Sequence, residues 1–166
     1  PFARLLGRGF GTALRAAGGR TAVLGRDCRT SSAALGEAMA AGLNESGVDV
    51  VDIGVVPTPL TYFAAHTLPV DGLVMITGSH NPPEYNGFKV GVGKATLHGA
   101  EIQELRRLIE SGRFAAGEGR YERRDVVGAY RAHLNENLQR GPRRLRAAVD
   151  AGNGSGGFVA VPLFES

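Results

Sequence analysis

Residues 77–89 bring together several side chains that can handle a phosphate group. They read Thr-Gly-Ser-His-Asn-Pro-Pro-Glu-Tyr-Asn-Gly-Phe-Lys. Ser79 offers a hydroxyl nucleophile, and the same string supplies an imidazole, an amide and a cation from His80, Asn81 and Lys89. Phosphoryl transfer needs mainly positioning and charge neutralisation from a protein, and these groups supply both. The string therefore predicts a phosphoryl-transfer site with Ser79 at its centre.

The small and rigid residues of this string predict how its backbone is held. We expect Gly78 to permit a backbone shape that brings the Ser79 hydroxyl out of the end of a strand, because glycine tolerates conformations that other residues avoid. Pro82 and Pro83 should keep the loop in place, since proline fixes its own φ angle. The alternative is a proline-stiffened turn in which Ser79 and Asn81 only bond the backbone. That alternative explains single residues but not the whole string.

A serine next to a histidine also raises the question of acyl hydrolysis. Serine hydrolases of the α/β type carry Gly-x-Ser-x-Gly, whereas the position two after Ser79 is Asn81. In addition, successive side chains of an extended segment point to opposite sides, so we expect Ser79 and His80 to point apart. The sequence therefore disfavours a serine hydrolase.

The order of strands and helices places this string at one edge of a sheet. Short apolar runs predict strands, and apolar residues at helical spacing predict helices. The predicted helices cover residues 2–17, 32–47, 58–66, 99–111 and 126–138, and the predicted strands cover residues 21–24, 48–53, 72–77 and 88–92. Such alternation predicts a three-layer α/β/α sandwich with a mainly parallel mixed sheet. Ligands bind where loops leave the carboxyl ends of parallel strands, which here means the loops after Leu24, Ile53 and Thr77.

Residues 141–166 differ in kind from the rest of the chain. Gly141 and Pro142 interrupt the preceding helix, residues 145–149 predict a strand, and residues 150–157 predict a glycine-rich turn into a helix. One strand and the start of one helix leave apolar surface uncovered. We therefore expect residues 1–140 to form the α/β/α domain and residues 141–166 to be the incomplete beginning of a second domain.

Composition narrows the class of protein. The 166 residues are 43% hydrophobic and 21% charged, with a formal net charge of +3, which is ordinary for a globular protein. The basic residues are spread along the chain, so an anionic small molecule fits better than a nucleic acid. No apolar run is long enough for a membrane span, and no signal-peptide pattern opens the chain. The single cysteine, Cys28, which we expect to be partly buried, indicates a reducing compartment, and we expect a cytoplasmic location.

Residues 77–89 resemble the active-serine signature of the α-D-phosphohexomutase superfamily, in the form typical of bacterial phosphomannomutase/phosphoglucomutase. Residues 25–32 are similar to the Gly-Arg-Asp loop of the family's first domain, and residues 54–59 are similar to its Pro-Thr-Pro loop. Residues 149–156 resemble the start of the family's second domain. The resemblance thus covers nearly the whole chain, and it implies the fold of a phosphoglucomutase first domain.

The resemblance implies a reversible exchange of hexose 6-phosphate and hexose 1-phosphate through a phosphoserine and a bisphosphorylated sugar. Ser79 matches the phosphoserine, whose phosphate also contacts Mg²⁺, and glucose 1,6-bisphosphate is the implied activator. His80 and Lys89 match catalytic positions, and Asn81 matches a phosphate contact. Residues 26–29 lie in the loop beside the phosphoserine. Its candidate phosphate-binding side chains are Arg26 and Arg29, and the alternative for both is a local salt bridge at the start of a helix.

The resemblance also indicates a preferred sugar, and it shows which motifs of the family this sequence does not contain. Phosphoglucosamine mutases usually carry an aromatic residue in place of Pro83 and Asp in place of Tyr85, so glucose or mannose phosphates are favoured. The family's Tyr-Asp-Ile-Arg-Gly segment is absent, as are the metal loop, the sugar loop and the phosphate-binding loop of domains II to IV. The expected partners are therefore those domains and a hexose phosphate. The alternative is a non-catalytic domain that only binds phosphate or sugar phosphate.

Overall fold

The computed structural model describes residues 1–139, 141, 142 and 146–165 of the chain. Its helices are α1 (Phe2–Ala16), α2 (Ser32–Glu45), α3 (Thr58–Thr67), α4 (Ala100–Ser111), α5 (Val127–Asn137) and α6 (Gly157–Phe164). Its strands are β1 (Thr21–Arg26), β2 (Asp49–Val55), β3 (Gly72–Ile76), β4 (Phe88–Val92), β5 (Ala95–Thr96) and β6 (Tyr121–Arg123). Every helix and strand predicted before residue 140 is present, with small differences at the ends.

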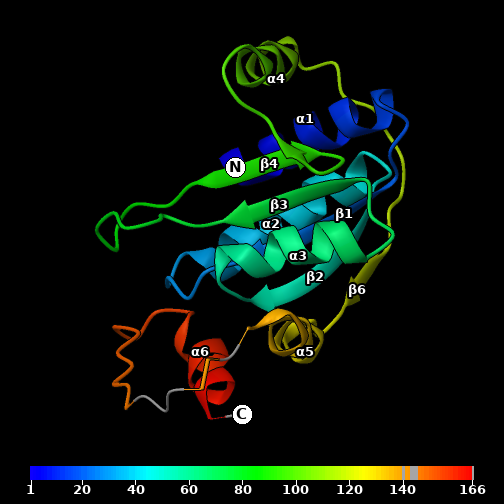
Figure 1. The fold of residues 1–166 in the computed structure, drawn as a ribbon. Helices are drawn as coiled ribbons and strands as arrows, with labels where there is room; N and C mark the ends of the chain where they lie inside the picture. The colour runs from blue at the N-terminus through cyan, green and yellow to red at the C-terminus, as the bar shows by residue number, and fades with distance from the viewer. Residues whose placement is uncertain (140, 143–145, 166) are drawn as a thin grey trace.

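A single sheet connects the strands of the described residues, in the order β5-β4-β3-β1-β2-β6. β1 pairs in parallel with β2 and β3, and β2 pairs in parallel with β6. β4 runs antiparallel to β3 and β5, so the predicted mainly parallel mixed sheet is confirmed. Because β3 and β4 are antiparallel neighbours, residues 77–87 form the loop of a hairpin, which projects from the sheet in Figure 1.

Helices cover both faces of this sheet, and β1 shows why. Ala22 and Leu24 point into one hydrophobic core and Val23 points into the other. A strand that is buried on both faces becomes a continuous apolar run, which is the pattern that predicted it. In Figure 1, α3 lies on the viewer's side of the sheet and α1 and α2 lie behind it. The predicted three-layer α/β/α sandwich is confirmed.

Helices α1 and α2 approach each other closely because glycines face each other across their contact. A Cβ atom added to Gly7 would lie 2.5 Å from the carbonyl oxygen of Met39, and one added to Gly42 would lie 2.2 Å from the carbonyl oxygen of Arg4. Both neighbours are backbone atoms, which cannot move aside as a side-chain end can. This contact fixes α2, whose first turn adjoins the loop after β1.

Three short segments differ from the sequence-based predictions. The strands β5 and β6 lie at the two edges of the sheet and were not predicted, since each has few residues and β6 is exposed along its length. The strand predicted at residues 145–149 is wrong for residues 146–149, which form no strand, and Leu145 lies outside the described residues. A strand needs a neighbour for its backbone hydrogen bonds, and this segment has none among the described strands.

The segment after residue 146 does form the predicted turn and helix. The turn leads into α6, whose Val159 is buried in the same cluster as Leu60 of α3 and Val126. The division into domains at residue 140 stays a prediction. None of the helices in the described residues is long and apolar enough to cross a membrane.

Candidate active site

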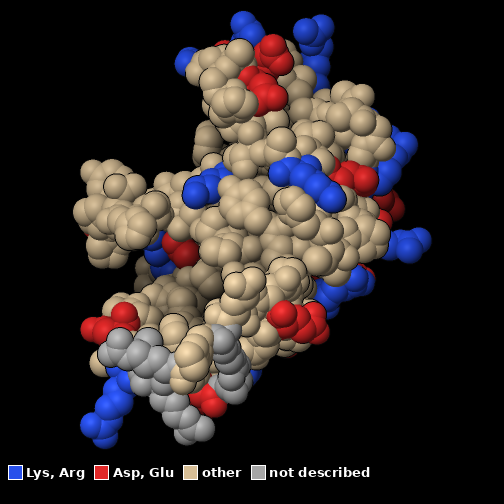
Figure 2. Space-filling model, viewed as in Figure 1, with Lys and Arg blue, Asp and Glu red and all other residues tan. Residues whose placement is uncertain are grey.

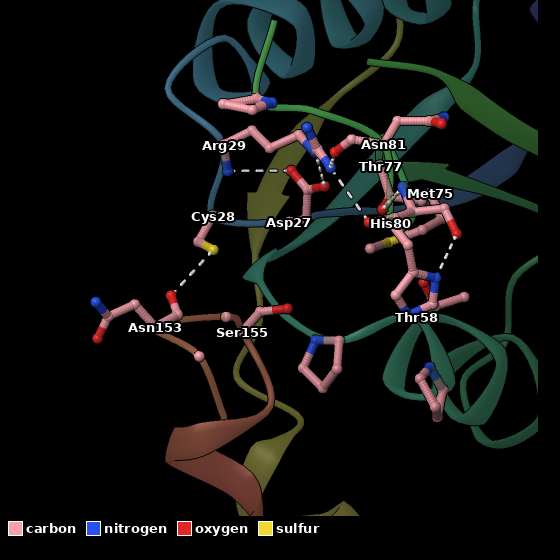
Figure 3. Close-up of a pocket in the computed structure, with 16 residues that line it drawn as sticks. Asp27, Cys28, Arg29, Thr58, Met75, Thr77, His80, Asn81, Asn153 and Ser155 are labelled. Atoms are coloured by element: carbon pink, nitrogen blue, oxygen red, sulfur yellow. Dashed lines mark hydrogen bonds and ion pairs between the residues drawn. The ribbon is translucent and has the colours of Figure 1, made fainter. Parts of the chain in front are cut away.

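A cavity of about 520 Å³ lies at the carboxyl ends of the parallel strands. Its walls come from four segments: the loop after β1, the loop after β2, the loop between β3 and β4, and the turn before α6. The three loops picked out in the sequence therefore meet in space, and the turn at residues 152–155 closes a fourth side. Figure 2 shows the hollow between the projecting 77–87 loop and the C-terminal segment, and Figure 3 shows the side chains around it.

Ser79 has a left-handed backbone, with φ of 54°. This region is uncommon for residues other than glycine, and roughly 1–3 kcal/mol of strain is stored there when the surroundings impose it. Its N–H donates to the Thr77 hydroxyl at 3.0 Å. Its own hydroxyl lies exposed beside the cavity, 3.2 Å from Nδ1 of His80.

The expectation that Ser79 and His80 point apart is wrong. It assumed an extended backbone, in which neighbouring side chains alternate. The left-handed residue instead turns the chain so that the hydroxyl and the imidazole lie on the same side and share a hydrogen bond. A serine–histidine pair thus exists in the loop, although the Gly-x-Ser-x-Gly turn of the hydrolases does not.

Gly78 has a different role from the one predicted. The left-handed φ belongs to Ser79, and the φ of Gly78 lies outside that region. A Cβ atom at Gly78 would lie 2.5 Å from both Cζ and Nε of Arg29. Glycine is required here for space, since the guanidinium group packs directly on its backbone.

Asp27 is a buried carboxylate at the base of the cavity. It accepts hydrogen bonds from the Ser32 hydroxyl, from the backbone N–H of Arg29 at 3.1 Å and from that of Gly78 at 3.2 Å. Burial alone would raise the pKa of Asp27, but the hydrogen bonds from Ser32, Arg29, Thr77 and Gly78 together lower it below its usual value. Asp27 is therefore ionised at neutral pH and ties the loop after β1 to the Ser79 loop.

Arg29 gives every N–H group of its guanidinium to protein acceptors. Nε donates to Asp27 Oδ2 at 3.1 Å, and the side chains of both residues are almost buried. The other four N–H groups donate to backbone carbonyls of the Ser79 loop, namely those of Ser79, Asn81, Pro82 and Tyr85. This arrangement leaves no N–H group for a phosphate and matches the alternative of a salt bridge at the start of α2.

The remaining predicted residues divide between the cavity and its surroundings. His80 and Asn81 line the cavity, as Ser79 does. Arg26 does not, since its guanidinium donates to both carboxylate oxygens of Asp52, at 3.0 and 3.1 Å. Lys89 does not line the cavity either, but it is exposed on β4 opposite Met75, which does.

Lys89 nevertheless lies next to a residue that lines the cavity, namely Met75. Opposite residues of an antiparallel pair have Cβ atoms about 5 Å apart on the same face. Among the described residues, no hydrogen bond or ion pair occupies its ammonium group. A cation without such partners in the described part of the chain, on a strand next to the cavity, suits the neutralisation of a phosphate.

The described residues do not by themselves fit a magnesium site. Mg²⁺ prefers oxygen ligands, usually one or two carboxylates with phosphate oxygens and water. Asp27 is the carboxylate that lines the cavity in the described part of the chain, and its oxygens are already engaged by hydrogen bonds. No group of three His, Cys, Asp or Glu side chains that could hold a metal occurs among the residues described. The expectation of Mg²⁺ stays a prediction.

Several lining residues were not singled out in the sequence as site residues. Thr58, Asn153 and Ser155 line the cavity, and Asn153 has φ of 56° in a turn stabilised by a hydrogen bond from the N–H of Gly154 to the carbonyl of Ala151. Cys28 is exposed rather than partly buried, and its sulfur lies 3.6 Å from the carbonyl oxygen of Asn153. The glycine-rich turn was predicted, but its return to the loop after β1 could not be read from the sequence.

Comparisons with known proteins give one consistent result. A family model described as phosphoglucomutase/phosphomannomutase, alpha/beta/alpha domain I, matches residues 1–116. A phosphoglucomutase of Neisseria meningitidis serogroup B is 42% identical over 165 residues, which are 98% of this chain and 36% of that protein. A phosphomannomutase/phosphoglucomutase of Pseudomonas aeruginosa is 39% identical over 161 residues, which are 97% of this chain and 35% of that protein.

The solved structures agree with these relatives. A crystal structure of a phosphoglucomutase/phosphomannomutase family protein from Burkholderia thailandensis superimposes with a TM-score of 0.94 at 44% identity. The match covers 99% of this chain and 37% of that one. The chain therefore spans about a third of the length of the relatives that it matches.

Proposed function

Because the chain belongs to the phosphoglucomutase/phosphomannomutase family, we propose that it is the first domain of a mutase that interconverts hexose 6-phosphates and hexose 1-phosphates. In this proposal Ser79 carries the phosphoryl group, and a bisphosphorylated sugar forms between the two transfers. One observation carries the proposal: the Ser79 hydroxyl is exposed beside the cavity, in a left-handed turn that brings it to Nδ1 of His80.

The loop suits a hydroxyl that is phosphorylated and dephosphorylated in turn. When phosphoserine donates, the bond from phosphorus to Ser79 Oγ breaks and a bond from phosphorus to a sugar hydroxyl oxygen forms, and the proton lost by the sugar hydroxyl ends on Ser79 Oγ, the leaving group. When Ser79 accepts, its Oγ attacks phosphorus, the bond from phosphorus to the sugar oxygen breaks, and the Ser79 proton passes by way of His80 Nδ1, at 3.2 Å, to that sugar oxygen. The second transfer returns the phosphoryl group, so phosphate is conserved over the cycle.

The surroundings favour a small anion as substrate. Lys89 supplies an unpaired ammonium group beside the cavity, and Asn81 lines it. On the face drawn in Figure 2, Lys and Arg side chains are scattered among Asp and Glu and form no continuous stripe of the kind that binds nucleic acid. The sequence of residues 83–86 favours glucose or mannose phosphates as the sugar. Mg²⁺ in the full-length enzyme would contact the phosphate on Ser79, with its other ligands outside the described residues.

Intact-mass measurement of the full-length protein tests this proposal. After incubation with glucose 1,6-bisphosphate, the wild-type protein should gain the mass of one phosphoryl group, and Ser79→Ala should not. Ser111→Ala is the matched control, since this serine is the last residue of α4, does not line the cavity and donates its hydroxyl to the carbonyl of Leu108, so its loss should leave the mass gain intact. A phosphoryl group that persists in Ser79→Ala would contradict the assignment of Ser79.

For the 166-residue chain alone, the arrangement favours binding without turnover. The cavity is bounded by three loops of the α/β/α sandwich and by the turn at residues 152–155, and the described residues provide no metal cluster. We expect a hexose phosphate to bind weakly near Ser79 and no mutase activity in a coupled assay with glucose 1-phosphate, with or without added Mg²⁺. Measurable turnover by this chain would show that domains II to IV are not needed.

A further inference from the structure

Four backbone carbonyls of the 77–87 loop converge on one side chain. The Arg29 guanidinium donates to the carbonyl oxygens of Asn81 and Pro82 at 2.7 and 2.6 Å, and to those of Tyr85 and Ser79 at 3.1 and 3.2 Å. The carbonyls are spread over residues 79–85, and Figure 3 shows the guanidinium lying between Asp27 and the loop. A planar fork with five donors can hold several acceptors in fixed directions.

The Arg29 guanidinium is itself held by Asp27, which is buried. Asp27 holds the Nε of Arg29, and it also accepts from the Ser32 hydroxyl in the first turn of α2 and from the N–H of Gly78. The side chains of Asp27 and Arg29 are 11% and 13% exposed, so water competes little for these hydrogen bonds. Gly78 leaves room for the guanidinium to pack on the backbone next to Ser79.

The strained residue of the loop lies inside this set of contacts. Ser79 keeps a left-handed φ although it is not a glycine, and such a conformation persists only where its surroundings impose it. Its carbonyl is bound by Arg29, and its N–H is bound by Thr77, whose side chain bonds Asp27. The Asp27–Arg29 pair thus restrains the backbone on both sides of the Ser79 Cα atom.

We propose that Arg29 is a positioning residue whose guanidinium shapes the 77–87 loop, and thereby aims the Ser79 hydroxyl at His80 and the cavity, rather than a ligand for substrate phosphate. The inference rests on the proposed function of Ser79 as phosphoryl carrier. It differs from the role that the family resemblance implies, because a phosphate would have to displace one of the five hydrogen bonds of the guanidinium.

Kinetics of the full-length mutase separate the two roles. Arg29→Lys keeps the positive charge but loses the planar fork, and Arg29→Gln loses both. If Arg29 positions the loop, both variants lower kcat on the order of 100-fold, because a misplaced reacting group loses its productive geometry, and KM for glucose 1-phosphate changes little. If Arg29 binds substrate phosphate, KM rises and Arg29→Lys retains much of the activity, and that result would overturn the proposal. Arg106→Lys, in an exposed ion pair with Glu110 on α4, is the control.

Hydrogen–deuterium exchange gives a readout that does not depend on activity. In the same variants, faster amide exchange should be confined to residues 78–87, while amides of β1 and β3 keep their protection. A general loss of stability would instead speed exchange throughout the sheet, and unchanged exchange in the loop would refute the positioning role. Because exchange requires no turnover, it still tests Arg29 if Ser79→Ala retains its phosphoryl group and the proposed function fails.

Discussion

Gly78 lies against the guanidinium of Arg29 so closely that a Cβ atom on Gly78 would be 2.5 Å from Cζ. The distance is shorter than any that real Cβ atoms tolerate, so a larger residue must push the guanidinium away from the carbonyls that it binds. Ser79 follows directly in the chain. A single methyl group is therefore enough to test how the loop shape and the nucleophile are coupled.

Gly78→Ala should reduce phosphorylation of Ser79 about as strongly as Arg29→Gln does. Both changes remove the same contact, so the double variant should lose little more than either single variant. Rates of phosphoryl gain measured by intact mass check this expectation. Gly156→Ala is the control, because Gly156 has an ordinary φ of −76° and open space around its Cα. Fully additive losses would show that Gly78 acts independently of Arg29.

Ser79 stores strain that a glycine at this position would release. A left-handed conformation costs a non-glycine residue about 1 kcal/mol or more, and glycine avoids this cost. Ser79→Gly should therefore unfold with a free energy about 1 kcal/mol higher than Ser79→Ala, although both lack the hydroxyl and neither can be phosphorylated. Urea denaturation of the two variants measures the difference. Equal stabilities would mean that the loop relaxes when the serine is removed.

Much of the fold could be predicted because its strands are buried on both faces. The apolar run at residues 21–24 and the one at residues 72–77 gave strands β1 and β3, and the alternation with helices gave the parallel sheet. The carboxyl ends of these strands then placed the loops of the cavity. The sequence pattern did not predict β5 and β6, because they are short edge strands. It wrongly predicted a strand at residues 146–149, where no neighbouring strand is present among the described residues.

The detailed geometry of the site depends on contacts between residues that are far apart in the sequence. Such contacts produce no pattern in the neighbouring residues from which they could be predicted. The left-handed conformation lies at Ser79 rather than at Gly78, and Arg29 fills the space beside the glycine. Arg29 meets carbonyls 50 to 56 positions away in the sequence, and Cys28 meets Asn153 across 125 positions. Residue types in the string predicted phosphate chemistry at Ser79, but which of the neighbouring side chains are occupied by contacts within the protein could be read only from the structure.

Acid should weaken the domain through Asp27. Its pKa is lowered in the folded state, so its contribution to stability is complete above the unfolded pKa of about 3.9 and is lost as the pH falls towards the folded value. Stability measured by urea denaturation should therefore decline as the pH falls below about 4. Asp27→Asn should be less stable at neutral pH by about 3 kcal/mol, because Arg29 loses its charged partner, and its decline in acid should be shallower.

The control for this measurement is an exposed carboxylate. Asp125→Asn alters a side chain on the surface that caps the backbone N–H of Val127, and its stability should follow the same pH profile as the wild-type domain. A profile for Asp27→Asn that runs parallel to the wild type would mean that other carboxyl groups cause the acid response.

The contact between α1 and α2 yields a prediction about stability alone. Gly42→Ala places a methyl group 2.2 Å from the carbonyl oxygen of Arg4, and the helices must separate to accommodate it. Overpacking of this kind costs about 1–3 kcal/mol, which exceeds the gain from better helix propensity. Gly128→Ala in α5 is the matched case, because nothing lies near its Cα, and it should stabilise the domain by about 0.5–1 kcal/mol. Thermal unfolding of both variants measures whether each substitution raises or lowers the stability. A stabilising effect of Gly42→Ala would show that the helices can move apart at little cost.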